Sequence, residues 1–138
     1  MASRLNPYMS FDGNAPEAME TYRDVFGGEL SVNTFGDFGQ PDEALKDKVM
    51  HSMLETPAGF TLMAADQPPG GTEHQPGNTF AVSLSGDDEA ELRGYWDQLS
   101  DGGTVTLQLE KQMWGDVFGM CIDRFGTPWM VNIAQPQE

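Results

Sequence analysis

Apolar residues recur at helical spacing in the first half of the chain. Between Asn14 and Gly28 they alternate with polar residues in the pattern typical of an amphipathic helix that packs one face on a core. The side chain of Asn14 can cap the first turn, and Gly27-Gly28 supplies a left-handed stop. The sequence therefore predicts a helix between these signals. Its apolar stripe consists of Ala18, Met19, Tyr22, Val25 and Phe26.

A second helical pattern occupies the other half. It begins near Asp87-Asp88, where carboxylates suit the positive end of a helix dipole, and ends at Asp101 before Gly102-Gly103. Gly94 inside this helix costs up to ~1 kcal/mol of helix stability relative to Ala. We expect that a glycine is tolerated there because it permits close approach of the helix to a sheet. The apolar stripe consists of Leu92, Tyr95, Trp96 and Leu99.

Short runs of β-prone residues flank the two helices, and each half reads strand, helix and then three strands. The segments Glu55–Gly59 and Asp123–Pro128 have the composition of hairpin turns. The predicted strands lie near residues 5–11, 30–36, 48–56, 59–65, 78–84, 104–110, 116–123 and 128–134.

The two halves repeat each other. We align Ser10 with Ser83 and Tyr22 with Tyr95, and Thr61-Leu62-Met63 matches Pro128-Trp129-Met130. The Pro- and Gly-rich segment 67–77 reads as a linker loop. The prediction is a single domain over 1–138, with module 1 at about 4–66 and module 2 at 78–135. The expected fold class is α+β: two tandem βαβββ modules form a curved mixed sheet around a central cavity, with the helices on the outer face.

Composition narrows the choice of partners. The chain has 138 residues, of which 38% are hydrophobic and 21% charged, as in a globular domain. The net charge of −15 repels nucleic acid and anionic membranes, and reads either as a solubility device or as an adaptation to a high-salt cytoplasm. The chain has no 20-residue apolar run and no signal-peptide pattern, so we expect a cytoplasmic protein. The single Cys121 excludes a disulfide framework.

Five stretches, spread in order over nearly the whole chain, resemble the vicinal oxygen chelate superfamily, which includes glyoxalase I, extradiol dioxygenases and bleomycin-resistance proteins. The nearer resemblance is to its PhnB-like branch. This resemblance implies the paired βαβββ fold. The stretches are Phe11-Asp-Gly-Asn14, Tyr22-Arg-Asp-Val-Phe-Gly-Gly28, Leu62-Met-Ala-Ala-Asp66, Trp114-Gly115 and Phe118-Gly-Met-Cys-Ile-Asp-Arg-Phe-Gly-Thr-Pro-Trp-Met-Val-Asn132.

The resemblance also implies a divalent metal, which superfamily enzymes bind through His and Glu on the first and fourth strands of each module. The corresponding segments 8–10, 60–65, 79–83 and 129–132 contain no His, Asp or Glu. Hard-cation and zinc sites need imidazole or carboxylate donors. Asp66, just beyond the fourth predicted strand, supplies one ligand at most. We therefore expect no metal and no cofactor.

Other chemistry is sparse. His51 and Glu55 lie on one face of a predicted strand, either as a ligand-binding or proton-sharing pair or as a partly exposed polar pair. His74 lies in the linker and reads as solvent-facing. Cys121 reads as a small buried hydrophobe.

Methionines and aromatic residues are the material available to line a pocket. Two functions stay open: a metal-free protein that binds a small molecule, and a metal-dependent lyase, isomerase or dioxygenase-type enzyme of the same superfamily. A quinone methyltransferase is disfavoured because no Gly-x-Gly-x-x-Gly stretch follows a strand. Uncovered apolar residues further predict a homodimer. The pocket candidates are Tyr8, Ser10, His51, Met53, Met63, Ser83, Trp114, Phe118, Met120 and Asn132.

Overall fold

The computed structural model describes residues 3, 5–39, 41–43, 46–67, 74–75, 77 and 79–136. The chain divides into two compact units, Met1–Gln75 and Pro76–Glu138. The boundary falls in segment 67–77, which the sequence predicts as a linker and most of which lies outside the described residues. Within the described ranges, no helix is long and apolar enough to cross a bilayer.

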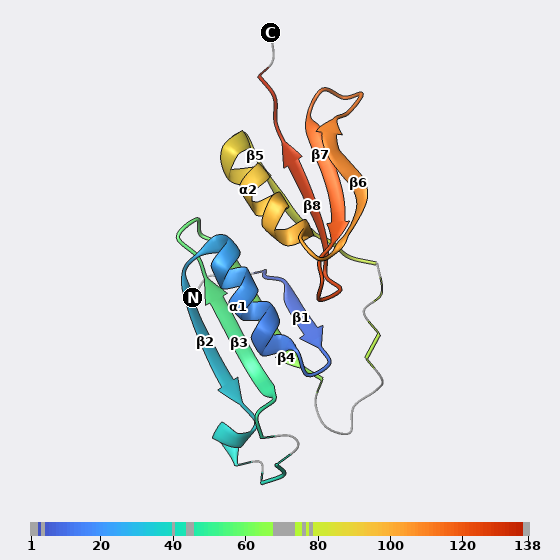
Figure 1. Ribbon diagram of the computed structural model, residues 1–138. Helices are drawn as coiled ribbons and strands as arrows, with labels where there is room; N and C mark the ends of the chain where they lie inside the picture. Colours follow the sequence, from blue (N-terminus) through green and yellow to red (C-terminus); the bar gives the residue numbers. More distant parts are fainter. Residues whose placement is uncertain are drawn as a thin grey trace. The chain divides into compact units, whose positions relative to one another are not determined.

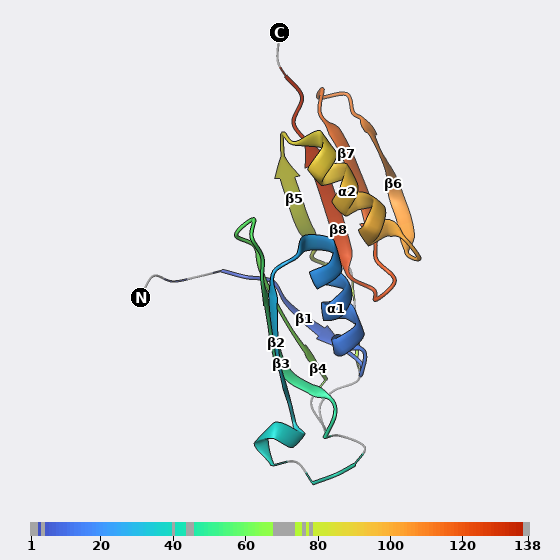
Figure 2. The same ribbon diagram turned by 60° about the vertical axis from the view of Figure 1, so that its left-hand side comes forward.

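The first unit is a four-stranded sheet with one helix against it (Figure 1). The strand order is β1-β4-β3-β2, with β1 parallel to β4 and the other neighbours antiparallel. Helix α1 packs against β2, β3 and β4 on one face of this sheet (Figure 2). The elements are β1 (Tyr8–Phe11), α1 (Ala15–Phe26), β2 (Glu29–Thr34), the 3₁₀ turn η1 (Gly36–Phe38), β3 (Val49–Glu55) and β4 (Thr61–Asp66).

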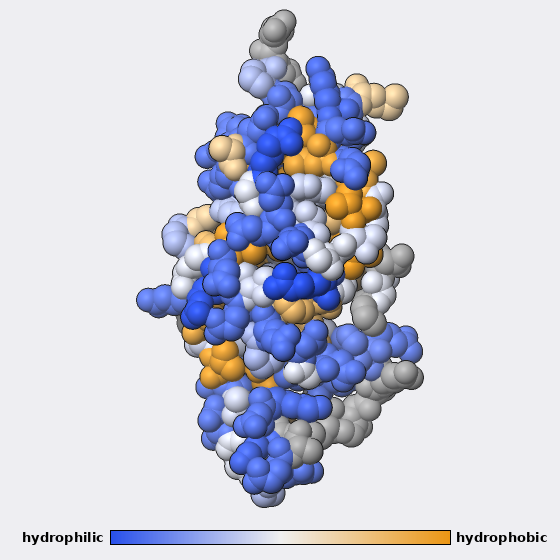
Figure 3. Space-filling view, viewed as in Figure 1, coloured by the Kyte–Doolittle hydropathy of each residue, from blue (hydrophilic) through white to orange (hydrophobic). Residues whose placement is uncertain are grey.

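The second unit repeats this arrangement. Its strand order is β5-β8-β7-β6, with β5 parallel to β8, and α2 packs against β5, β7 and β8. In the view of Figure 3, hydrophilic side chains cover much of the outer surface of both helices. The α+β prediction of two βαβββ modules is confirmed, whereas a single cavity enclosed by both stays a prediction. The elements are β5 (Val82–Gly86), α2 (Glu89–Ser100), β6 (Thr104–Lys111), β7 (Val117–Ile122) and β8 (Pro128–Ile133).

A buried carboxylate joins three elements of the first unit. Asp66 is only 1% exposed, and its Oδ1 accepts a hydrogen bond from the N–H of Ala15 at 2.9 Å. Its Oδ2 accepts another from the N–H of Val49 at 2.8 Å. Asn14, by contrast, makes no side-chain capping bond. The prediction that Asn14 caps α1 is therefore wrong, and so is the placement of Asp66 beyond β4: it is the last residue of that strand and serves the start of the helix.

Two aspartates play comparable parts in the second unit. Helix α2 begins where the sequence predicts, and Asp88 caps it by accepting from the N–H of Glu91 at 3.1 Å. Asp123 organises the turn between β7 and β8: its Oδ1 accepts from the N–H groups of Phe125 and Thr127 at 2.9 and 3.0 Å. Its Oδ2 accepts from Nε1 of the buried Trp129 at 2.8 Å. The predicted hairpin turn is thus held by a carboxylate that the sequence does not single out.

The internal repeat has a slightly different register from the one read in the sequence. Trp96, not Tyr95, is the large aromatic residue that α2 buries against its sheet, so it takes the place of Tyr22. Ser10 lies opposite the fifth residue of β4, and Ser85, not Ser83, lies opposite the fifth residue of β8. Gly94 also differs from expectation, because nothing lies within 4 Å of a Cβ built on it.

Candidate functional site

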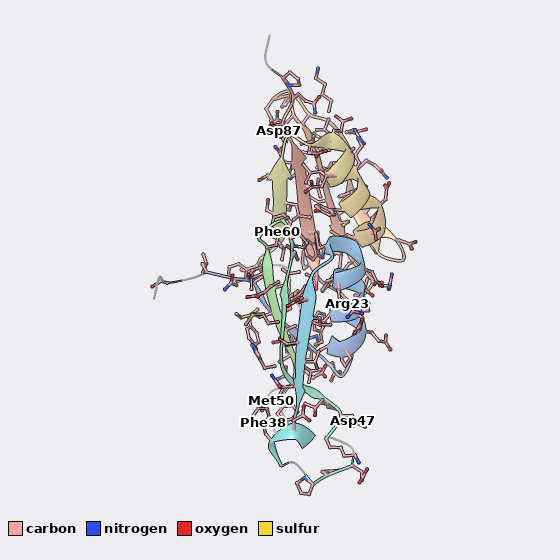
Figure 4. The ribbon with its side chains drawn as sticks, turned by 90° about the vertical axis from the view of Figure 1, so that its left-hand side faces the viewer. Arg23, Phe38, Asp47, Met50, Phe60 and Asp87 are labelled. Atoms are coloured by element: carbon pink, nitrogen blue, oxygen red, sulfur yellow. The ribbon has the colours of Figure 1, made fainter. Side chains whose placement is uncertain are left out.

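Each sheet has one face packed on its helix and one face that the helix leaves uncovered. Along β4, Leu62, Ala64 and Asp66 are buried on the helix side, whereas the alternate residues Thr61, Met63 and Ala65 are half-buried. Figure 4 views the first unit from the side: α1, which carries Arg23, lies on one side of the sheet, and side chains including a sulfur-bearing one project on the other. We call the second surface the open face of each sheet.

The open face of the first unit carries all five candidates from that half of the sequence. Strand pairing sets Tyr8 of β1 and Met53 of β3 on either side of Met63 of β4. Ser10 and His51 follow by alternation on β1 and β3, two residues from Tyr8 and Met53 respectively. The centre of this face is therefore a pair of thioethers bordered by hydroxyl and imidazole groups.

Tyr8 and His51 interact directly. The Tyr8 hydroxyl lies 3.2 Å from Nδ1 of His51, and the ring centroids are 5.8 Å apart. Because β4 lies between β1 and β3, this contact spans one strand. Glu55 pairs in register with Thr61 at the hairpin end of β3, and Asp66 points to the helix side. An enzyme using a residual acid–base pair would need His51, Glu55 or Asp66 to converge. Glu55 lies four residues after His51 on β3 and Asp66 bonds to the start of α1, so the structure does not bring these groups together.

The open face of the second unit carries three candidates on its central strands. Met120 of β7 lies opposite Met130 of β8, which lies opposite Ser83 of β5. Phe118 lies opposite Asn132, two pairs further along β7 and β8 and therefore on the same face. The methionine pair of the first unit thus recurs here at the same strand positions.

Trp114, in the turn after β6, and Asn132 of β8 complete this face. The Trp114 ring is 59% exposed and meets the Phe118 ring edge-on, with centroids 5.6 Å apart. Asn132 donates from Nδ2 to Oδ2 of Asp116 at 3.1 Å, while the N–H of Gln135 donates to Oδ1 at 3.2 Å. The Asp116 carboxylate therefore orients the Asn132 amide so that its oxygen stays available as an acceptor. The sequence gives no signal for this role of Asp116.

The side chains present do not fit the divalent metal that the resemblance implies. The open-face positions of the first and fourth strands of each module hold hydroxyl, thioether, methyl, proline and amide groups. Such groups are poor donors for a hard divalent cation. In the part of the chain that the structure describes, no three His, Cys, Asp or Glu residues group as metal ligands.

Cys121 lies on the helix side of β7 and is 1% exposed. Burial, with a smaller contribution from the charge of Asp123, raises the pKa of its thiol from 9.0 to about 11. Because the thiol of the unfolded chain ionises first, raising the pH through this window favours the unfolded state. We expect iodoacetamide at pH 8 to alkylate Cys121 only as fast as the chain opens, and rapidly in denaturant. Alkylation of the folded protein at the rate of a free thiol would contradict this placement.

Comparison with known proteins gives consistent matches over nearly the full length. The family described as the Glyoxalase/Bleomycin resistance protein/Dioxygenase superfamily matches residues 4–131. Protein YjdN of Escherichia coli is 28% identical over 96% of this chain and 97% of its own. The crystal structure of PA1353 from Pseudomonas aeruginosa is 37% identical with a TM-score of 0.87, covering 98% of this chain and 100% of that one.

A third match carries a functional name. It is a structure from Bacillus cereus described as a putative 3-demethylubiquinone-9 3-methyltransferase, PhnB protein. It is 20% identical with a TM-score of 0.75 and covers 96% of this chain and 100% of that one. At this level of identity the likeness concerns the fold alone.

Proposed function

Because the chain belongs to the glyoxalase/bleomycin resistance/dioxygenase superfamily, we propose that it is a PhnB-like, cytoplasmic member that binds a small organic molecule without a divalent metal. The observation that carries this proposal is the composition of the open faces. Each presents a cross-strand pair of methionines beside oriented polar groups, and neither offers the donors of a hard-cation site.

The chemistry of these faces suits binding more than catalysis. Thioethers are flexible and polarisable, so the Met53–Met63 and Met120–Met130 pairs adapt to an apolar body of varied outline. Fixed polar groups then set orientation: the Tyr8–His51 pair on one face and the amide oxygen of Asn132 on the other. Such a surface needs no reactive group to hold a ligand.

The other functions lack a supporting observation. A metal-dependent lyase, isomerase or dioxygenase needs donors that the open faces do not provide. The methyltransferase name belongs to the Bacillus cereus protein, which is 20% identical to this chain. The sequence here has no glycine-rich dinucleotide-type loop after a strand.

The binding proposal predicts saturable uptake of a neutral apolar dye. We expect Nile red to bind in the presence of EDTA with a blue-shifted emission. Met130→Glu, which places a charge on the open face of β8, should weaken binding by at least about tenfold. The matched control Gln98→Glu alters the exposed side of α2 and should leave binding unchanged. Fluorescence titration of the three proteins, with circular dichroism to verify folding, tests this. The absence of saturable binding, or equal effects of both variants, would contradict the proposal.

We also propose that the protein is a homodimer in solution. A chain of 15.1 kDa with a net charge of −15 repels its own copies, so an interface must be largely apolar. We expect light scattering to give about twice the chain mass, and this mass should persist in molar salt, which screens the repulsion. A mass of one chain at micromolar concentration, with or without salt, would refute the dimer.

A further inference from the structure

We propose that the open face of the first unit binds one soft monovalent metal ion, Cu(I) or Ag(I), through the thioether sulfurs of Met53 and Met63 and Nε2 of His51. Tyr8 acts as a positioning residue that orients the imidazole. This site goes beyond the proposed function, which requires no metal.

The strand register brings the three ligands to one place. Met53 and Met63 are directly paired across β3 and β4 on the open face, and such partners have Cβ atoms about 4.5–5.5 Å apart. His51 is two residues before Met53 on the same face of β3, diagonal to Met63 and within reach of long side chains. All three are half-buried, and methionine has three rotatable bonds with which to turn its sulfur toward a common point.

The Tyr8 contact is compatible with the tautomer of His51 that binds a metal through Nε2. When Nδ1–H of His51 donates to the Tyr8 hydroxyl oxygen, which lies 3.2 Å away, Nε2 keeps its lone pair. A histidine that binds a metal through one ring nitrogen commonly donates a hydrogen bond from the other, and the acceptor of that bond fixes both the tautomer and the ring orientation. Tyr8 is also paired with Met63 across β1 and β4, so it neighbours two of the three proposed ligands, Met63 and His51.

The donor set selects the kind of ion. Two thioethers and one imidazole are soft to intermediate ligands, which suit Cu(I) and exclude Mg²⁺ or Ca²⁺. The net charge of −15 raises the local concentration of any cation near the surface without deciding which one binds. The thioether and imidazole donors that the register brings together, Met53, Met63 and His51, determine which ion binds.

The second unit provides a matched comparison within the same molecule. Met120 and Met130 are paired across β7 and β8 as Met53 and Met63 are across β3 and β4. Their open-face neighbours on these strands are Phe118 and Asn132, so this pair has no imidazole. Two thioethers alone should bind a soft ion more weakly than two thioethers with a histidine.

The test is a titration of the full chain with silver nitrate in chloride-free buffer, followed by NMR of ¹³C-methyl methionine. All proteins carry Cys121→Ala, because a thiol binds soft ions more tightly than a thioether. The Met→Leu variants assign the signals and conserve volume, so they preserve folding. We expect the Met53 and Met63 methyl signals to shift up to one equivalent, and those of Met120 and Met130 to move only later.

Affinity measurements in the same background separate the ligands. Met63→Leu and His51→Gln should each weaken silver binding by at least about tenfold, and Tyr8→Phe by about tenfold. Met130→Leu should leave the first binding event within about twofold of the parent. The proposal is overturned if Met63→Leu and Met130→Leu have equal effects, if His51→Gln has none, or if the first equivalent shifts no methyl signal of the Met53–Met63 pair.

Discussion

Replacing Asp66 by Ala is expected to lower the free energy of unfolding by about 3 kcal/mol or more. The substitution removes the carboxylate that accepts hydrogen bonds from two N–H groups, those of Ala15 at the start of α1 and Val49 at the start of β3. Each buried donor left unpaired costs about 1–3 kcal/mol, and the bonds to an ionised acceptor lie at the upper end. Urea denaturation followed by circular dichroism measures the change.

Two further variants isolate the cause of that loss. Asp66→Asn keeps the shape but turns an NH₂ group toward an N–H donor, so it should also destabilise the fold strongly. Asn14→Ala is the matched control at the same end of α1, because the Asn14 side chain makes no capping bond. It should change stability by less than about 0.5 kcal/mol. Similar losses for Asn14→Ala and Asp66→Ala would show that the carboxylate is not the cap.

Alanine at Gly28 should destabilise the protein by about 3 kcal/mol or more. A Cβ at Gly28 would lie 2.1 Å from the carbonyl oxygen of Glu55, and the residue has a φ of +105°. Gly103 holds the matching place after α2, where a Cβ would lie 2.2 Å from the carbonyl oxygen of Ile122. In both units the chain leaving the helix passes so close to the neighbouring strand that only glycine fits, so Gly103→Ala should be similarly costly.

Gly94→Ala is the control for these glycines. Gly94 lies within α2 and has nothing within 4 Å of a built Cβ, so alanine gains helix propensity at no steric cost. We expect an increase in stability of about 0.5–1 kcal/mol. Thermal and urea unfolding should therefore show that Gly28→Ala and Gly103→Ala lower the free energy of unfolding, whereas Gly94→Ala raises it. A Gly28→Ala protein as stable as the parent would contradict the close approach.

Local pattern was enough to predict both helices and both hairpin turns, because periodicity and turn chemistry are written in consecutive residues. The first strand of each half was placed too early. The predicted strand at 78–84 includes Phe80, which is 84% exposed, whereas β5 is Val82–Gly86. Pairing with β8 fixes these bounds, and that pairing joins residues more than 40 positions apart.

In the candidate site too, local pattern predicts which residues of one strand share a face, whereas contacts between distant segments are not predicted. Alternation along a single strand correctly placed His51 and Glu55 on one face of β3. The Tyr8–His51 contact joins residues 43 apart across an intervening strand, and no local pattern reports it. Asp66 was considered as a metal ligand because it directly follows the fourth predicted strand, but its carboxylate accepts hydrogen bonds from N–H groups of α1 and β3.

The central claim is that this chain binds a small organic molecule without a divalent metal, and native mass spectrometry of freshly purified protein, paired with elemental analysis, tests it most directly. We expect a bound organic molecule and less than a stoichiometric amount of zinc, nickel, manganese or iron. One tightly held ion of these metals per chain, with no organic molecule retained, would contradict the claim.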